Sequence, residues 1–368
     1  MPLSLPRNAQ LWVPGVVASR LRRTFQPRHH HGLTDIFFCI ADHYEPEHGE
    51  VDLGVQRGRV AAWVERYPAV AQQFADSDGR PPQHTFFFPE EAYRPELLDP
   101  LADLCRRGFG DVEIHLHHDH DTANALRDRL GYFTEALFHK HGLLRRRGDG
   151  TITYGFVHGD WALDNARPDG RGCGVNNEIT ILLETGCYAD FTLPAAPDPS
   201  QTRTVNSIYY AVDDPDRPRS HEYGVPVRAG VPPPANGLLM VQGPLAFDMR
   251  RRIWAVFPGL ENGAIDGSDA HLPTLDRFAS WVRVGVAVAG RPDWVFVKVY
   301  THGAIEQNAA VLLGPAMTAF HTDINRVFND GIRYRLHYVT AHEMATLVKA
   351  AEAGLEGSPR DLMRKQLL

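Results

Sequence analysis

Short apolar runs alternate with longer stretches of helical periodicity along most of the chain. The apolar runs lie at 35–41, 84–88, 112–117, 152–157, 187–191, 207–212, 237–242, 294–300 and 334–339. Apolar residues recur every three or four positions in the stretches between them, at 55–74, 97–108, 122–142, 176–185, 272–289, 308–328 and 340–353. This alternation is typical of parallel strands joined by helical crossovers.

The number of strand-helix units predicts the architecture. Seven or eight units predict one large α/β domain, a distorted (β/α)7–8 TIM-like barrel, over residues 33–355. The Pro-rich and Asp-rich stretch at 194–236 is expected to be a long loop excursion from that barrel. Residues 1–32 are expected to form an N-terminal arm and residues 356–368 a C-terminal tail.

Composition and charge exclude several classes of protein. Hydrophobic residues make up 43% of the chain and charged residues 23%, which is the balance of a globular protein. The formal net charge of -7 argues against a nucleic-acid partner, because a protein that binds phosphate backbones carries a basic excess. The four cysteines are far apart and form no CxxC pair, so neither a disulfide framework nor a zinc site made only of thiolates is expected.

The N-terminal region contains an apolar patch at residues 11–18. The patch lacks the flanks of a secretion signal, and no run of about 18 apolar residues occurs that could span a membrane. Arg20, Arg22 and Arg23 follow the patch and could bring it to a membrane surface, although a docked arm is the favoured interpretation. We therefore expect a cytoplasmic protein with no transmembrane segment, and surface positions for residues 29–31, three consecutive histidines.

The densest chemistry lies at the end of the third predicted strand. Residues 113–121 read Glu-Ile-His-Leu-His-His-Asp-His-Asp, with four histidines and three acids in nine positions. Strand alternation directs Glu113, His115 and His117 to one side. Imidazole nitrogens and carboxylate oxygens are ligands that zinc prefers, so a metal site is predicted here, with a solvated polar strand end as the alternative.

Polar residues follow three other predicted strands. Asp42 and His43 come directly after the first strand, His158 after the fourth and His302 after a late one. Because the active sites of (β/α) barrels lie where the strands end, we expect these side chains to converge with those of 113–121. Alone, Asp42 could cap the following turn, and a single histidine at a strand end is often structural.

Glu91 and Trp161 also follow predicted strands. An aromatic ring can stack on the apolar face of a sugar while a carboxylate binds its hydroxyl groups, so both suit the recognition of a carbohydrate. Packing is the alternative for each. The chain has no Gly-x-Ser-x-Gly motif, which argues against a serine nucleophile.

These motifs together resemble those of the polysaccharide deacetylase superfamily, over about residues 33 to 353. Asp42-His43 is similar to the Asp-Asp pair that ends the first strand of that family. His117 and Asp121 stand where the family's His-(Ser/Thr)-x-x-His motif has its two histidines. The exchange of one aspartate for histidine and one histidine for aspartate keeps two imidazoles and one carboxylate in the set.

Two further segments carry the resemblance. Residues 158–161, His-Gly-Asp-Trp, look like the Arg-x-Pro-aromatic motif without its arginine, and residues 300–302, Tyr-Thr-His, resemble the Leu-x-His motif of the catalytic acid. The family consists of metal-dependent enzymes with a distorted barrel that remove acetyl groups from sugars. The chain therefore looks like a divergent branch of that superfamily.

The resemblance implies a mechanism. A divalent metal ion, zinc above all, with nickel, cobalt or manganese as substitutes, would be held by His43, His117 and Asp121. Asp42 would act as the general base and His302 as the general acid that protonates the departing amine. The remaining candidates would support the ligands or contact the substrate; they are His115, Glu91, His158 and Trp161.

Several alternatives stay open at this point. Asp42 could bind the metal, with Glu91 or Glu113 as the base. The His115-Leu116-His117 sequence also suits another metal-dependent barrel amidohydrolase, although that motif normally ends the first strand. Asp42 and Glu91 could form the carboxylate pair of a glycoside hydrolase. An inactive carbohydrate-binding homologue is the last alternative, and in each case the expected partner is an oligosaccharide or a small molecule.

Overall fold

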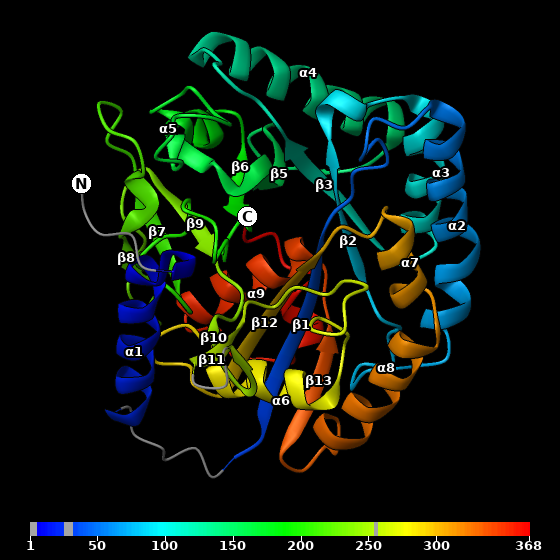
Figure 1. Cartoon of the computed structure of the whole chain (residues 1–368), viewed down its shortest axis with the longest axis vertical. Coiled ribbons are helices and arrows are strands. Elements are labelled where there is room, and N and C mark those ends of the chain that lie inside the picture. Colours follow the sequence, from blue (N-terminus) through cyan, green and yellow to red (C-terminus); the bar gives the residue numbers. More distant parts are fainter. Residues whose placement is uncertain (1–5, 26–31, 254–256) are drawn as a thin grey trace.

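A large, mostly parallel β-sheet forms the centre of the protein (Figure 1). The computed structural model describes residues 6–25, 32–253 and 257–368. The parallel strands are β1 (Thr34–His43), β2 (His84–Pro89), β3 (Gly110–Leu116), β5 (Ile152–His158), β6 (Cys187–Asp190), β9 (Gly237–Val241), β12 (Trp294–Thr301) and β13 (Tyr334–Tyr338). Antiparallel pairing adds β4 (Arg145–Arg146), β7 (Ile208–Val212) and β8 (Val225–Pro226).

Strand β1 occupies the middle of the pairing. One of its edges pairs with β12 from Asp35 to Asp42, while the other pairs first with β13 and then, from Ala41 to His43, with β2. The strand order is β12-β1-β2-β3-β5-β6-β9-β7-β8. In the described part of the chain, no ladder joins the two ends of this order into a closed barrel.

Helices cover the two faces of the sheet unequally. One face packs against α2 (Leu53–Ala71), α3 (Pro95–Arg106), α4 (Ala123–His141), α5 (Glu178–Glu184), α6 (Leu275–Val284), α7 (Glu306–Leu312) and α8 (Pro315–Phe328). The other face packs against α9 (Ala341–Glu352) and α10 (Pro359–Leu362). We call the hydrophobic cluster on the first of these faces the first core and that on the face of α9 and α10 the second core. Side chains of β1 alternate between them, with Phe38 in the first core and Phe37 in the second core.

The predicted mixed α/β architecture is confirmed, and one local prediction needs correction. The stretch 308–328 was expected to be one helix but is divided into α7 and α8. Pro315 begins α8 because its ring prevents the previous helix from continuing through it. The stretch 246–261, for which no strand was predicted, contains the hairpin of β10 (Ala246–Ile253) and β11 (Phe257–Glu261).

The N-terminal region is helical. Helix α1 (Ala9–Phe25) buries Trp12 and Val16 against Val205 of the excursion and Leu245 beside the hairpin. The three histidines at 29–31 lie outside the described residues. Within the described ranges, no helix is both long and apolar enough to cross a membrane.

Short 3-10 helices complete the structure. They are Pro6–Asn8, Glu90–Ala92, Gly159–Trp161, Leu163–Asn165 and Ser220–Glu222. Two of them directly follow the carboxyl ends of β2 and β5. Since β1, β2, β3, β5 and β12 all run parallel, the polar residues at their carboxyl ends lie at one edge of the sheet.

Candidate metal centre

Four imidazoles surround one carboxylate at the carboxyl edge of the sheet. Glu45 Oε1 lies 3.3 Å from His115 Nε2 and 3.8 Å from both His117 Nε2 and His302 Nε2. The donor atoms of His43, Glu45 and His302 lie within 4.8 Å of one another, as do those of Glu45, His115 and His117. We call these five residues the Glu45 cluster, and the donor atoms of each group of three are close enough to hold a metal ion.

Strand alternation explains how the cluster forms. In β1, His43 shares its face with Phe37 and the other residues of the second core. Glu45 follows two positions later, and its carboxylate meets His115 near the end of β3. His302 follows the last residue of β12, which is the strand paired along β1. The parallel register of three strands therefore collects donors that are far apart in sequence.

Hydrogen bonds orient two of the imidazoles. His115 Nδ1 lies 2.8 Å from the carbonyl oxygen of Val157, which can only accept, so this nitrogen carries a proton and the ring is held with Nε2 facing Glu45. His117 Nδ1 lies 2.5 Å from Glu91 Oε1. In metal sites, a carbonyl or carboxylate bound to the far nitrogen of histidine fixes the ring in this way.

The electrostatics of the cluster favour a neutral His43 and an ionised Glu45. Burial, helped by the neighbouring His302 and His115, holds the pKa of His43 well below its usual value. Its Nε2 is buried without a hydrogen-bond partner. Burial alone would raise the pKa of Glu45, but the hydrogen bond and charges of the surrounding histidines hold it well below the ordinary range.

Two further groups at this edge have shifted pKa values. Burial opposes protonation of His117, but the hydrogen bond and charge of Glu91, with the charge of Glu45, raise its pKa to about 9. Burial raises the pKa of Glu47 to about 7, with the charges of Glu91 and Glu45 adding to the effect. The carboxylates of Glu91 and Glu45 thus favour a positive charge on the neighbouring groups at the carboxyl edge.

Asp42 lies outside the Glu45 cluster. It points to the opposite face of β1, is fully buried, and uses both carboxylate oxygens. Oδ2 lies 2.8 Å from His84 Nε2, and Oδ1 accepts a hydrogen bond of 2.6 Å from the amide of Gly303. Trp63 Nε1 donates to the carbonyl of the same glycine at 2.8 Å. These contacts fix the loop that carries His302.

Three other sequence candidates also lie apart from the cluster. Asp121 Oδ2 lies 3.3 Å from His118 Nδ1 and 3.9 Å from an Arg129 nitrogen. His158 Nε2 lies 3.3 Å from Glu178 Oε1. Glu113 is buried and accepts hydrogen bonds from the Tyr188 hydroxyl and the Gly155 amide, both at 2.5 Å.

Glu45 was missed by the sequence analysis, although a signal for it exists. It lies two positions after His43, which is the spacing that places two side chains on one face of an extended segment. Trp161, by contrast, lies beside the cluster, with its ring centroid 6.3 Å from that of His43 and 6.4 Å from that of His302.

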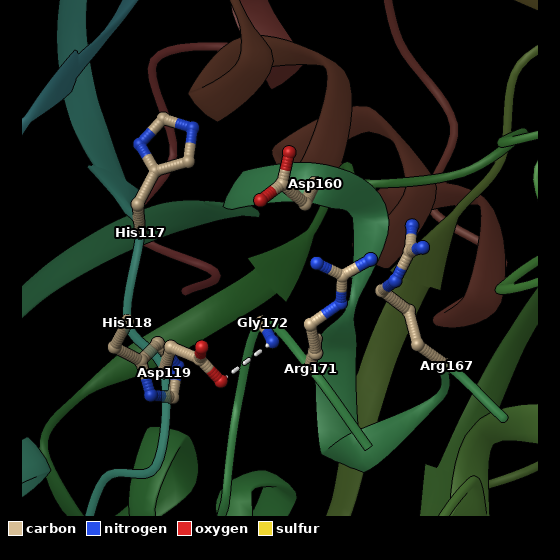
Figure 2. A pocket seen from close by; sticks show the side chains of 7 residues that line it. All are labelled: His117, His118, Asp119, Asp160, Arg167, Arg171 and Gly172. Carbon is tan, nitrogen blue, oxygen red and sulfur yellow. Dashed lines mark hydrogen bonds between the residues drawn. The ribbon is translucent and has the colours of Figure 1, made fainter. Parts of the chain in front are cut away.

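A pocket of about 530 Å³ opens next to His117 (Figure 2). His117, His118 and Asp119 line one side, while Asp160, Arg167 and Arg171 line the other. The amide of Gly172 donates to Asp119 Oδ1 at 2.9 Å and so joins the two walls. Asp160 and Trp161 both have positive φ angles, of 51° and 53°, which are uncommon for such residues and are found preferentially at functional sites.

No protein-family model matches the chain, and no curated protein is significantly similar to it in sequence.

Proposed function

We propose that the protein is a metal-dependent hydrolase that removes the acetyl group from an N-acetylated sugar, glycan or glycoconjugate. The observation that carries this proposal is the convergence of four imidazoles on the Glu45 carboxylate at the carboxyl edge of a parallel sheet. A resemblance in four sequence motifs supports the acetylated substrate.

The donor set fits a divalent ion such as zinc. In a tetrahedral site with bonds of about 2.0 to 2.1 Å, neighbouring ligand atoms are roughly 3.3 Å apart. The 3.3 and 3.8 Å separations around Glu45 Oε1 are close to that value. The unpartnered Nε2 of buried His43 is a further lone pair that an ion would satisfy. Nickel, cobalt and manganese also accept imidazole and carboxylate ligands.

We assign the ligand roles from the hydrogen bonds. Glu45, His115 and His117 would bind the ion, because both imidazoles present Nε2 to the same oxygen. His43, whose donor atom lies within 4.8 Å of that of Glu45, can complete the set. One carboxylate with neutral imidazoles leaves a bound divalent ion with net positive charge. A bound ion of this kind lowers the pKa of water toward about 7 and polarises a carbonyl oxygen.

The protein's own groups would position the substrate and move protons. His302 is the candidate acid for the departing amine, since its side chain is 27% exposed at the edge of the cluster. Trp161 can stack on a sugar ring beside it. The adjoining pocket, with Arg167 and Arg171 in its wall, offers space for the remainder of the substrate.

The proposal also includes the finer form of the fold, a distorted (β/α) barrel. Two contacts beyond the strand ladders support it. Ala264 forms an isolated parallel β-bridge with Tyr300, on the edge of β12 that faces away from β1. Lys298 Nζ donates to the carbonyl oxygens of Phe191 and Leu193, at 2.6 and 2.7 Å, and so links β12 to the chain that follows β6.

Acetate release from N-acetylated sugar oligomers tests the activity. We expect release that stops with a chelator and resumes when a divalent ion is added back. His117→Ala should lose both the metal ion of the Glu45 cluster and acetate release, whereas the control His139→Ala should keep them, because His139 is an exposed residue of α4 that pairs with Glu135. Full metal occupancy of His117→Ala by elemental analysis would overturn the proposal. Sugar cleavage that survives chelation would indicate a glycoside hydrolase instead.

A further inference from the structure

A second group of metal-binding side chains lies beside the Glu45 cluster but shares no residue with it. His118 follows β3, His158 ends β5, Cys173 belongs to the loop before α5, and Glu178 is the first residue of α5. One donor atom from each lies within 4.8 Å of those of the other three. We call these four residues the Cys173 cluster. All four are buried.

The distances centre on Glu178. Its Oε1 lies 3.1 Å from His118 Nε2 and 3.3 Å from His158 Nε2, while its Oε2 lies 3.3 Å from Cys173 Sγ. These values are close to the separation of about 3.3 Å expected between oxygen and nitrogen ligands of one tetrahedral ion, with sulfur somewhat further away. One thiol, two imidazoles and one carboxylate are all established zinc ligands.

The orientation of His158 points to a missing partner. Its Nδ1 lies 2.6 Å from the carbonyl oxygen of Gly159, so that nitrogen carries the proton. The lone pair is then on Nε2, which is fully buried, faces the cluster and has no hydrogen-bond partner. A buried polar atom without a partner costs free energy, and a metal ion at the centre of the cluster removes that cost.

Charge balance gives an independent argument. Glu178 is completely buried, and the basic side chains that reach its carboxylate in the described part of the chain are those of His118 and His158 only. A buried carboxylate needs a compensating cation, and neither lysine nor arginine supplies one there. A thiolate, a carboxylate and two neutral imidazoles together balance the two positive charges of a divalent ion.

We propose that the Cys173 cluster binds a structural zinc ion with Cys173 Sγ, His118 Nε2, His158 Nε2 and a Glu178 oxygen as its four ligands. Four protein ligands close the coordination sphere, which is typical of structural rather than catalytic zinc. Binding deprotonates the thiol and releases that proton to solvent. Asp121, at 3.3 Å from His118 Nδ1, would orient that imidazole.

The ion would hold the wall of the neighbouring pocket. Cys173 lies in the same loop as Arg171 and Gly172, which line the pocket, and its carbonyl accepts a hydrogen bond of 3.0 Å from the amide of Asp121. A zinc ion that joins this loop to the ends of β3 and β5 would fix its position. The site thus connects the stability of the fold to the shape of the pocket.

Cobalt substitution of the full chain tests the proposal. A thiolate bound to Co²⁺ gives an intense charge-transfer absorption in the near ultraviolet, which ligands without sulfur do not give. We expect this band in the cobalt-loaded protein and in Cys187→Ala, a matched control in which another buried cysteine is removed. We expect Cys173→Ala to lose this band. Elemental analysis should show that it also contains one zinc ion per chain fewer than the parent. A band retained in Cys173→Ala, or absent from the fully loaded parent, overturns the proposal.

A second pair of variants tests the same site if Cys173→Ala does not fold. Cys173→Ser and Glu178→Gln keep the size of each side chain, and circular dichroism reports whether they remain folded. Both should lose one zinc ion per chain, and a folded Cys173→Ser that keeps the parent's full zinc content contradicts the site. His117→Ala, which removes a ligand of the Glu45 cluster, should keep the cobalt–thiolate band, so the outcomes for the two sites are distinguishable.

Discussion

The carboxylate of Asp42 accepts a hydrogen bond of 2.6 Å from the amide of Gly303, a residue 261 positions later in the chain. The bond joins the end of β1 to the loop after β12 on the face of the sheet away from the Glu45 cluster. A Cβ atom on residue 303 would overlap both this carboxylate and the indole ring of Trp63. Asp42 therefore acts on His302 through the backbone next to it.

Asp42→Asn distinguishes this positioning role from that of a general base. The asparagine amide has one oxygen and cannot accept from both His84 and Gly303 as the carboxylate does. We therefore expect the free energy of unfolding to fall by about 1–3 kcal/mol, and the affinity for metal to fall as well. Chemical denaturation and metal titration measure the two effects. The exposed helix cap Asp52→Asn serves as the control and should change neither. Unchanged stability and metal content with lost activity would instead indicate the base that the sequence suggested.

Glu91→Gln should weaken metal binding at the Glu45 cluster. Glu91 Oε1 fixes the His117 ring through Nδ1 at 2.5 Å, and removal of such a supporting carboxylate typically costs about 10- to 100-fold in metal affinity. Competition with a chromogenic chelator measures the affinity. Glu90→Gln is the matched control, because Glu90 pairs with Arg129 and not with a cluster histidine. Equal affinities of the two variants would contradict the role of Glu91.

Gly159→Ala should displace His117. A Cβ atom on residue 159 would overlap the imidazole ring of His117, so the ring must move or the backbone must shift. We expect loss of metal from the Glu45 cluster and a stability loss of about 1–3 kcal/mol from overpacking. Gly131→Ala, in an open position of α4, should instead stabilise the protein by about 1 kcal/mol. Full metal content in Gly159→Ala would show that the ring has room to adjust.

The contribution of His337 to stability should depend on pH. Nε2 lies 2.9 Å from Asp35 Oδ1 and Nδ1 lies 2.8 Å from Asp78 Oδ2. Burial opposes the cation, but these two carboxylates outweigh it and raise the pKa of His337. A raised pKa in the folded state stabilises the protein below the unfolded value of about 6.5, and this stabilisation is lost as pH rises through the folded pKa.

His337→Gln is therefore expected to cost more stability at about pH 6 than at about pH 9. The pKa of Asp35 and that of Asp78 are lowered in the folded protein, by His337 among other partners, so part of the contribution also disappears as pH falls through their values. Urea unfolding of parent and variant at both pH values measures the difference. An exposed control, His139→Gln, should show little cost at either pH. A cost for His337→Gln that is the same at both pH values rules out this electrostatic origin.

Much of the architecture could be predicted from the chain alone. The apolar runs of β1, β2, β3 and β12 and the periodic stretches of α2, α3 and α4 determine strands and helices locally. The sequence also contains a signal for the division of α7 from α8, because Pro315 directly follows Gly314. The packing of α9 against the face opposite the other large helices was not, because helical periodicity does not reveal which face of a sheet a helix will cover.

The residue types at the carboxyl edge of the sheet were determined by the sequence, which gathers histidines and acids after parallel strands. Only the tertiary structure decided which of them meet. Alternation fixes the direction of a side chain within a strand, as it does for Asp42 and His43, but β3 ends at Leu116. Beyond that residue the strand no longer constrains the side chains, and it is the loop that keeps His117 on the side of His115, toward Glu45, and directs His118 toward Glu178. Adjacent histidines thereby belong to two different clusters.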